Sequence, residues 1–227
     1  NSCIAIAGKL PKNYLEIFNN CELRESRKNL IYSKQICIDN ETIRKGREIA
    51  FFKDIEFSRI FMAWQIPCSK DQKNIIGYEI ISSILTDGRN SILNRSLKED
   101  NQIVESIYSG VQPGEFGSLF IIEASLEREN IQKVEDLINN LLQKLLTNSN
   151  LNNKSKKALR IVKSSYIFNL ETSSQLSQFY GNHLLWGRLN PQLELSKNLK
   201  YWENTENLKK LIKFFLKEKF TFIAHKI

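Results

Sequence analysis

Residues 87–110, DGRNSILNRSLKEDNQIVESIYSG, hold the most informative pattern in this chain of 227 residues. A Gly-Arg-x-Ser turn at residues 88–91 opens a short amphipathic helix over residues 91–98, and that helix leads into a strand over residues 103–109. Gly88 follows a helical pattern and accepts the left-handed conformation in which helices often end. The stretch therefore predicts a junction where one helix ends, a short helix follows and a strand begins.

The segments on either side of this junction alternate between strand and helix patterns. Upstream, Ser58–Ile66 alternates apolar and mixed residues, which is typical of a strand in a sheet covered on at least one face, and a helix follows over residues 75–85. Downstream, a strand over residues 114–126 precedes a helix over residues 131–146, whose apolar residues recur at three-four spacing.

The remaining segments extend the same pattern to both ends of the chain. Further strands are predicted over residues 3–7, 48–53 and 220–224. Further helices are predicted over residues 12–20, over 158–186 with a break near Thr172 or Gly181, and over 206–219 with Thr205 as the cap. Loops are expected over residues 21–45, with a weak strand near 35–38, and over the polar stretch 147–157. We expect a single α+β domain of two layers, a mixed sheet with helices on one face, whose first strand is residues 3–7 and last strand 220–224.

Composition excludes several classes of function. An apolar share of 41% with 26% charged residues is ordinary for a soluble globular protein, and no apolar run is long enough to span a membrane. The net charge is +8, but basic residues are scattered among acidic ones and no nucleic-acid-binding motif is visible. We therefore expect a solvated, lysine-rich surface with neither a nucleic-acid nor a membrane partner, and only non-specific attraction to acidic molecules at low salt.

The cysteines indicate a reducing environment. Cys3, Cys21, Cys37 and Cys68 form no C-x-x-C pair, and a disulfide framework is unusual in a chain of this length. Buried, reduced thiols are expected, which favours the cytoplasm or another reducing compartment. Because the only methionine is Met62, we also expect the chain to be part of a longer protein.

The order of elements, with Gly-Arg-x-Ser-x-Leu at residues 88–93, resembles the second half of an insulinase-type (pitrilysin-like) zinc peptidase subunit over nearly the whole chain. The resemblance implies the mitochondrial-processing-peptidase-like fold, with residues 1–227 as the C-terminal domain of a subunit. Such a domain forms the wall of the peptide-binding chamber opposite the zinc site. The partners implied are its own N-terminal half, a second subunit of the family and an extended peptide substrate.

The zinc site of that family is absent from this chain. The family holds zinc with an inverted H-x-x-E-H motif on a helix. The chain has only two histidines, His183 and His225, and neither has a carboxylate at the required spacing. The resemblance therefore implies no metal site and no cofactor here, with zinc bound by the N-terminal half, and His183 is expected on a helix surface or in the core.

A second signature of the family, Leu-Arg-Glu-x-x-x-x-Ala-Tyr, binds substrate and stabilises the oxyanion. Aligning Leu97-Lys98-Glu99 with it places Lys98 at the arginine and Glu105 at the tyrosine, whereas starting from Arg95 would pair it with Gln102. Lys98 keeps a positive charge without the bidentate fork, and Glu105 has the wrong sign beside an oxyanion.

The resemblance thus makes Lys98 and Glu105 substrate-binding candidates and leaves no intact catalytic group, so the chain alone is expected to be inactive. Two alternatives stay open. The parent protein is a zinc metalloendopeptidase whose other half or partner subunit supplies the active groups, or it is a non-catalytic scaffold or interaction subunit of the same family.

Overall fold

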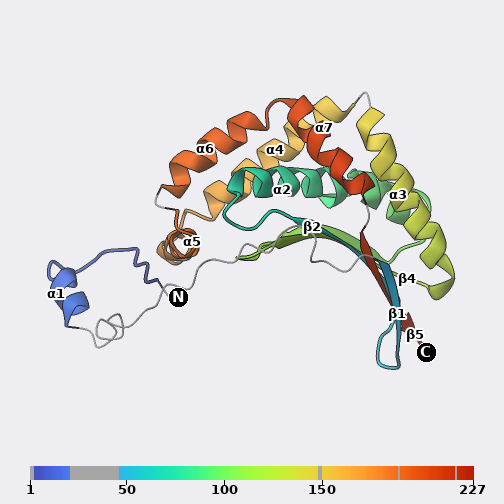
Figure 1. Cartoon of the computed structure of the whole chain (residues 1–227), viewed down its shortest axis with the longest axis horizontal. Helices are drawn as coiled ribbons and strands as arrows, with labels where there is room; N and C mark the ends of the chain where they lie inside the picture. The colour runs from blue at the N-terminus through green and yellow to red at the C-terminus, as the bar shows by residue number, and fades with distance from the viewer. Residues whose placement is uncertain (1–2, 21–45, 148–149, 189, 218) are drawn as a thin grey trace.

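A mixed β-sheet forms one side of the computed structural model, which describes residues 3–20, 46–147, 150–188, 190–217 and 219–227 (Figure 1). The sheet has five strands in the order β1-β5-β2-β4-β3. The strands are β1 (Gly46–Phe52), β2 (Ser58–Ile66), β3 (Ser106–Gln112), β4 (Ser118–Leu126) and β5 (Phe220–Lys226). β1 runs parallel to β5, and all other neighbours are antiparallel. The predicted mixed sheet is confirmed.

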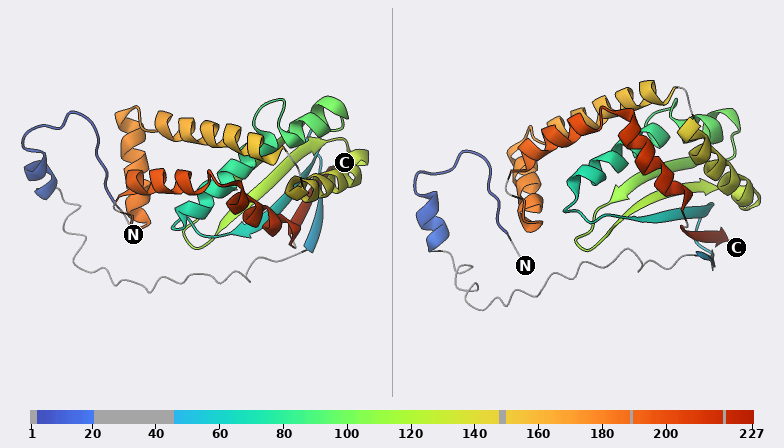
Figure 2. Two further views of the ribbon diagram at one scale, coloured as in Figure 1. Left: turned by 90° about the horizontal axis from the view of Figure 1, so that it is seen from above. Right: turned by 45° about the horizontal axis from the view of Figure 1, so that its top comes forward.

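The helices leave one face of the sheet open. They are α1 (Tyr14–Asn19), α2 (Gln72–Thr86), α3 (Ile131–Thr147), α4 (Leu151–Phe168), α5 (Ser173–Leu185), α6 (Pro191–Tyr201) and α7 (Thr205–Ile212). The described residues also form a π-helix, η2 (Asn94–Asp100), and two short 3-10 helices, η3 (Arg128–Asn130) and η4 (Lys213–Leu216). Figures 1 and 2 show α2, α3, α4, α6 and α7 gathered over one face, with α2 contacting β3 and α4, α6 and α7 packed on α2. The predicted two-layer α+β architecture is confirmed.

The sequence pattern explains why this face is covered. In β2, the side chains of Ile60, Met62, Trp64 and Ile66 are all buried, and they alternate with side chains that remain partly accessible. Because successive strand residues point to opposite faces, this alternation places one apolar face under the helices.

Aromatic rings join the sheet to the helical layer. Trp64 of β2 and Phe120 of β4 lie 5.2 and 4.6 Å, centroid to centroid, from the ring of Phe215 in η4. Tyr78 of α2 lies 5.9 Å from the same ring. Edge-to-face pairs at such distances add to the stability that buried area gives, so Phe215 links β2, β4 and α2.

The prediction of a first strand at residues 3–7 is wrong. This segment is extended but pairs with no described strand, and it runs along α5, where the Cys3 thiol donates to the Gly181 carbonyl oxygen over 2.9 Å. Along this segment burial alternates as in a strand, since Cys3, Ala5 and Ala7 are half-buried while Ile4 and Ile6 are exposed. The last predicted strand, at 220–224, is present as β5.

Several helix boundaries also differ from the predictions. The polar stretch 147–157 is not a loop throughout, because α4 begins at Leu151. The predicted break near Thr172 is present, with Thr172 forming a capping box with Gln175, whereas Gly181 lies inside α5. Asn204 rather than Thr205 caps α7, which ends at Ile212.

The N-terminal residues beyond this segment add little to the core. The predicted helix over residues 12–20 is present as α1, but no residue of α1 is buried. The predicted loop over residues 21–45, with its weak strand, lies outside the described residues. No helix in the described ranges is long and apolar enough to cross a membrane.

Candidate functional site

The junction singled out from the sequence begins where α2 ends. Gly88 has a φ of +79°, in the left-handed region that favours glycine. The Ser91 hydroxyl donates to the Gly88 carbonyl oxygen over 2.7 Å, and the Asn94 side-chain amide donates to the Thr86 carbonyl oxygen over 2.5 Å. The bond to Thr86 pairs a carbonyl group at the end of α2, and the bond to Gly88 lies within the following turn, so the turn after α2 has a defined conformation.

The short helix after the turn is held by buried leucines on one side and by an ion pair on its exposed side. Leu93 and Leu97 are fully buried under it. Arg89 holds both carboxylate oxygens of Glu99, with Nε to Oε1 at 3.1 Å and Nη2 to Oε2 at 2.6 Å. The helix predicted over residues 91–98 is thus present, with residues 94–100 wound as the π-helix η2.

The chain then turns into β3 through a left-handed residue. Gln102 has a φ of +52°, the only positive value for a non-glycine residue in the described part of the chain. The Ile103 amide donates to the Leu97 carbonyl oxygen over 3.0 Å, and the Glu105 amide donates to the Ser125 carbonyl oxygen over 2.8 Å. The strand therefore begins at Ser106, three residues later than predicted.

A buried group of hydroxyls fixes β3 to α2 behind the junction. The Ser82 hydroxyl donates to the Ser109 carbonyl oxygen over 2.8 Å, and the Ser109 amide donates to the Thr86 hydroxyl oxygen over 3.1 Å. The hydroxyl oxygens of Thr86 and Ser109 are also 2.8 Å apart. Because buried polar groups are costly unless paired, these bonds fix the position of β3 on the helix.

The two sequence-derived candidates, Lys98 and Glu105, lie side by side. The Lys98 ammonium donates to the backbone carbonyl oxygen of Glu105 over 2.7 Å. Both residues are exposed, and the Glu105 carboxylate takes no part in that bond. The structure thus places Lys98 and Glu105 next to each other, but their contact is made by the backbone carbonyl of Glu105 and not by its carboxylate.

The chemistry available at this junction is limited. The guanidinium fork of Arg89 is engaged by Glu99, and the Lys98 ammonium is engaged by a carbonyl. Stabilising an oxyanion requires donors that are free and directed at the place where charge develops. The bonds of the junction instead hold its own turns together.

Neither histidine has surroundings that suit a metal ion. His183 is buried on α5 between the rings of Phe179 and Trp186, and burial together with the Arg188 charge lowers the pKa of His183 to about 4. The ring of His225 lies against Phe51, and partial burial, Arg128 and Arg47 lower the pKa of His225. Within the described ranges, no three His, Cys, Asp or Glu side chains gather where they could hold a metal ion. These surroundings do not fit zinc.

The open face of the sheet presents a continuous row of side chains. The strand registers align Phe222 of β5, Phe61 of β2, Glu123 of β4 and Tyr108 of β3 directly across four neighbouring strands. The rings of Phe61 and Phe222 have centroids 6.1 Å apart, and 61% of Tyr108 is exposed. Figure 1 shows no described helix over this side of the sheet. The row is therefore accessible to another molecule.

A buried polar cluster went unnoticed in the sequence. The Tyr166 hydroxyl of α4 donates to Oε2 of Glu79 in α2 over 2.8 Å, and burial raises the pKa of Glu79 to about 7. Nearby, Arg188 donates to the Lys70 carbonyl oxygen over 2.6 Å and pairs with Glu194. No local pattern could reveal the contact between Glu79 and Tyr166, because the two residues lie on separate helices.

Known proteins resemble this chain in sequence and in fold. A family model described as the peptidase M16 inactive domain matches residues 1–158. No curated protein sequence matches the chain.

Three solved structures share the fold at low sequence identity. A protease from Helicobacter pylori aligns with a TM-score of 0.75 at 16% identity, over 96% of this chain and 53% of its own. A peptidase M16 inactive domain from Pseudomonas fluorescens aligns with a TM-score of 0.68 at 14% identity, over 80% and 43%. A chain of complex III2 from Candida albicans aligns with a TM-score of 0.67 at 13% identity, over 80% and 46%. This chain therefore spans about half the length of each of them.

Proposed function

The chain belongs to the peptidase M16 inactive-domain family, and we propose that it forms the non-catalytic wall of a peptide-binding chamber in an insulinase-type subunit. In this proposal residues 1–227 are the second domain of the subunit. The first half supplies the zinc motif, and a second family subunit completes the assembly. The solved structures that share the fold are about twice as long as this chain, which supports a missing half.

The observation that carries the proposal is the open face of the sheet. The row Phe222–Phe61–Glu123–Tyr108 offers aromatic surface and one carboxylate to a ligand, on a face that no described helix covers. Arg59 lies 3.5 Å from Glu123, so the row also has a cation at its border. An extended peptide could lay its side chains against the aromatic rings of this surface and place its polar groups near Glu123 and Arg59.

Peptide turnover by the intact subunit with its partner tests this role. Tyr108→Ala removes an exposed ring from the open face, and Leu193→Ala removes a side chain that is 67% exposed on the helical side. We expect Tyr108→Ala to raise KM for peptide at least fivefold and Leu193→Ala to change it less than twofold. Equal effects would contradict a chamber wall on the open face.

A scaffold or interaction subunit is the second candidate. It is supported by the junction, where the Lys98 ammonium bonds to a carbonyl of its own chain, and by the fold shared with a chain of complex III2. The coding sequence upstream of Asn1 distinguishes the two. An H-x-x-E-H helix there favours the peptidase, and its absence, with no peptide turnover by the assembly, favours the scaffold.

A further inference from the structure

The net charge of the chain is concentrated in its last helices. Residues 150–217 hold twelve Lys and Arg against four Asp and Glu, whereas the rest of the chain holds twenty-one of each sign. A general preference for lysine would spread the charge evenly. Figure 1 shows that these residues form the helices α4 to α7, on the side of the molecule away from the open sheet face. The whole excess of positive charge therefore lies in the segment that forms this helical surface.

Helix α4 is the centre of this charge. It carries five basic residues and no acidic one, namely Lys154, Lys156, Lys157, Arg160 and Lys163. Lys156, Arg160 and Lys163 follow one another at intervals of four and three residues, so they share one face of the helix over about 10 Å. The opposite face, with Leu151, Ser155, Ala158 and Val162, is buried.

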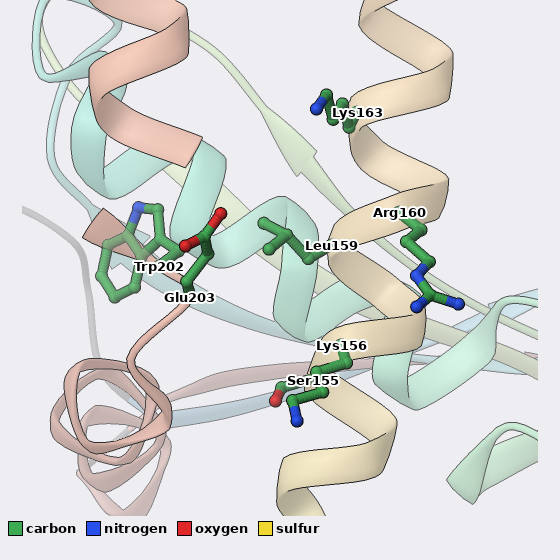
Figure 3. A pocket seen from close by; sticks show the side chains of 7 residues that line it. All are labelled: Ser155, Lys156, Leu159, Arg160, Lys163, Trp202 and Glu203. Carbon is green, nitrogen blue, oxygen red and sulfur yellow. The ribbon is translucent and has the colours of Figure 1, made fainter. Parts of the chain in front are cut away.

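This basic face borders a cavity between α4 and the end of α6. The cavity has a volume of about 320 Å³, and Leu159, Trp202 and Glu203 line it together with the three basic residues. Figure 3 shows Leu159 directed from α4 toward Trp202 and Glu203, with Lys163 higher on the same side of α4 and the Arg160 side chain extending away from Trp202 and Glu203. The indole of Trp202 is held by a bond of 2.7 Å from Nε1 to the Lys73 carbonyl oxygen. We call this site the α4 groove.

The basic residues of the α4 groove are not neutralised inside the protein. Within the described ranges, no ion pair involves Lys156, Arg160 or Lys163. Nearby cations such as Lys209 do have an acidic partner, Glu206, at 2.7 Å. Three like charges on one helix face repel one another, so an anionic ligand would relieve a cost already present in the fold.

We propose that the α4 groove binds an acidic segment of a partner protein, with carboxylates paired to Lys156, Arg160 and Lys163. An extended or helical peptide can space its carboxylates to match cations spread over about 10 Å. Its apolar side chains would cover the accessible part of Leu159. This surface lies on the helical side of the chain, so it is separate from the proposed chamber wall.

The composition of the groove favours a peptide over other anions. The Glu203 carboxylate lies in the same cavity and repels a compact, multiply charged anion such as phosphate, whereas a peptide can turn a backbone amide toward it. Insertion into a membrane surface requires apolar side chains that protrude. Here Leu159 is half-buried and Trp202 is only 2% exposed, so neither could enter a lipid layer.

Fluorescence anisotropy with a labelled decapeptide of alternating Glu and Ala tests the proposal on the 227-residue chain. Lys156→Glu, Arg160→Glu and Lys163→Glu are combined in one variant. The control combines Lys53→Glu, Lys133→Glu and Lys144→Glu, three exposed residues outside positions 150–217. Both variants make the same change in net charge, and circular dichroism confirms that each is folded. We expect the groove variant to weaken peptide binding at least tenfold and the control less than twofold.

Each other result overturns the proposal. Equal losses in both variants would show attraction to net charge alone, and absence of binding by the unchanged chain at 50 mM salt would show that the groove takes no acidic peptide. Anionic phosphatidylserine vesicles and a labelled dT10 oligonucleotide are measured in parallel. Tighter binding of either one, lost in the groove variant, would assign the site to a membrane or to nucleic acid.

Discussion

The Lys98 ammonium and the Glu105 carbonyl oxygen lie 2.7 Å apart, and this bond closes the turn between η2 and β3. The two residues are seven positions apart in sequence, yet only one of the two side chains takes part. The bond depends on the side chain of Lys98 but only on the backbone of Glu105, so the two side chains should contribute unequally to stability.

Replacement of each residue by alanine should therefore have different effects on stability. Lys98→Ala removes the donor and should lower the free energy of unfolding by about 0.5–1.5 kcal/mol, the usual net value of such a bond. Glu105→Ala keeps the carbonyl oxygen and should change it by less than about 0.5 kcal/mol. Urea unfolding monitored by circular dichroism measures both. An equal loss in the two variants would mean that the bond does not act as described.

The left-handed conformation of Gln102 predicts a stabilising substitution. Glycine adopts a φ of +52° without the clash that a Cβ brings, so Gln102→Gly should raise the midpoint of thermal unfolding. Gln102→Val places a branched Cβ in the same conformation and should lower it. The comparison is made by thermal denaturation, and a lower midpoint for Gln102→Gly than for the unchanged chain would refute the argument.

Two glycines should respond differently to replacement by alanine. A Cβ at Gly77 would lie 2.4 Å from Cζ2 of Trp202, a buried ring, so Gly77→Ala should cost about 1–3 kcal/mol although alanine favours helices. A Cβ at Gly110 would lie 2.1 Å from the Tyr108 hydroxyl, the end of an exposed side chain that can move away. Gly110→Ala should therefore be close to neutral in urea unfolding.

The raised pKa of Glu79 predicts a pH dependence of stability. Its pKa is about 7 in the folded chain because of burial, against an ordinary value of 4.5, so the folded state binds more protons between these values. The stability that Glu79 contributes is complete below pH 4.5 and is lost as pH rises through 7. His183 acts in the opposite direction, because its pKa is lowered to about 4 and its stability is lost as pH falls below 6.5.

Glu79→Gln separates these two contributions. Glutamine keeps an acceptor for the Tyr166 hydroxyl but cannot titrate. The difference in unfolding free energy between the unchanged chain and Glu79→Gln should therefore shift against the unchanged chain between pH 4.5 and 7. A difference that stays constant across this range would show that Glu79 does not titrate there.

The surroundings of the histidines predict that the chain alone binds no zinc stoichiometrically and cleaves no peptide. Aromatic rings surround His183, and cations rather than carboxylates lie near His225. Elemental analysis after chelator-free purification measures the metal, and a fluorogenic peptide measures cleavage. One tightly held zinc ion per chain, lost in His183→Ala or His225→Ala, would overturn this account.

Local periodicity explains why some elements could be predicted and others could not. Ser58–Ile66 matches β2 residue for residue, because its burial alternates as its apolar residues do. The start of α4 was missed because its first turn is Asn- and Lys-rich and Ser155 fills a buried position. Residues 3–7 form a short apolar run like that of a buried strand, but it is the helix α5, not a sheet, that half-buries one side of the segment.

At the junction around Lys98, too, local spacing could be predicted from the sequence, whereas contacts made by the backbone or by distant residues could not. The spacing of seven residues between Lys98 and Glu105 is visible in the sequence, and the structure brings both together. The acceptor is a backbone carbonyl, a group that every residue possesses, so no residue pattern could identify it. Glu79 and Tyr166 are 87 positions apart, and only the packing of α4 on α2 makes them neighbours.

The position of β5 between β1 and β2 in the sheet has a consequence for biosynthesis. β2 is complete at Ile66, but β5, which covers one of its edges and carries β1 on its other side, begins only at Phe220. At usual translation rates of about 5–20 residues per second, that edge of β2 waits roughly 10–30 s for its partner. A nascent chain with an unpaired apolar strand edge is prone to aggregate. We therefore expect a ribosome-associated chaperone to bind β2 during synthesis.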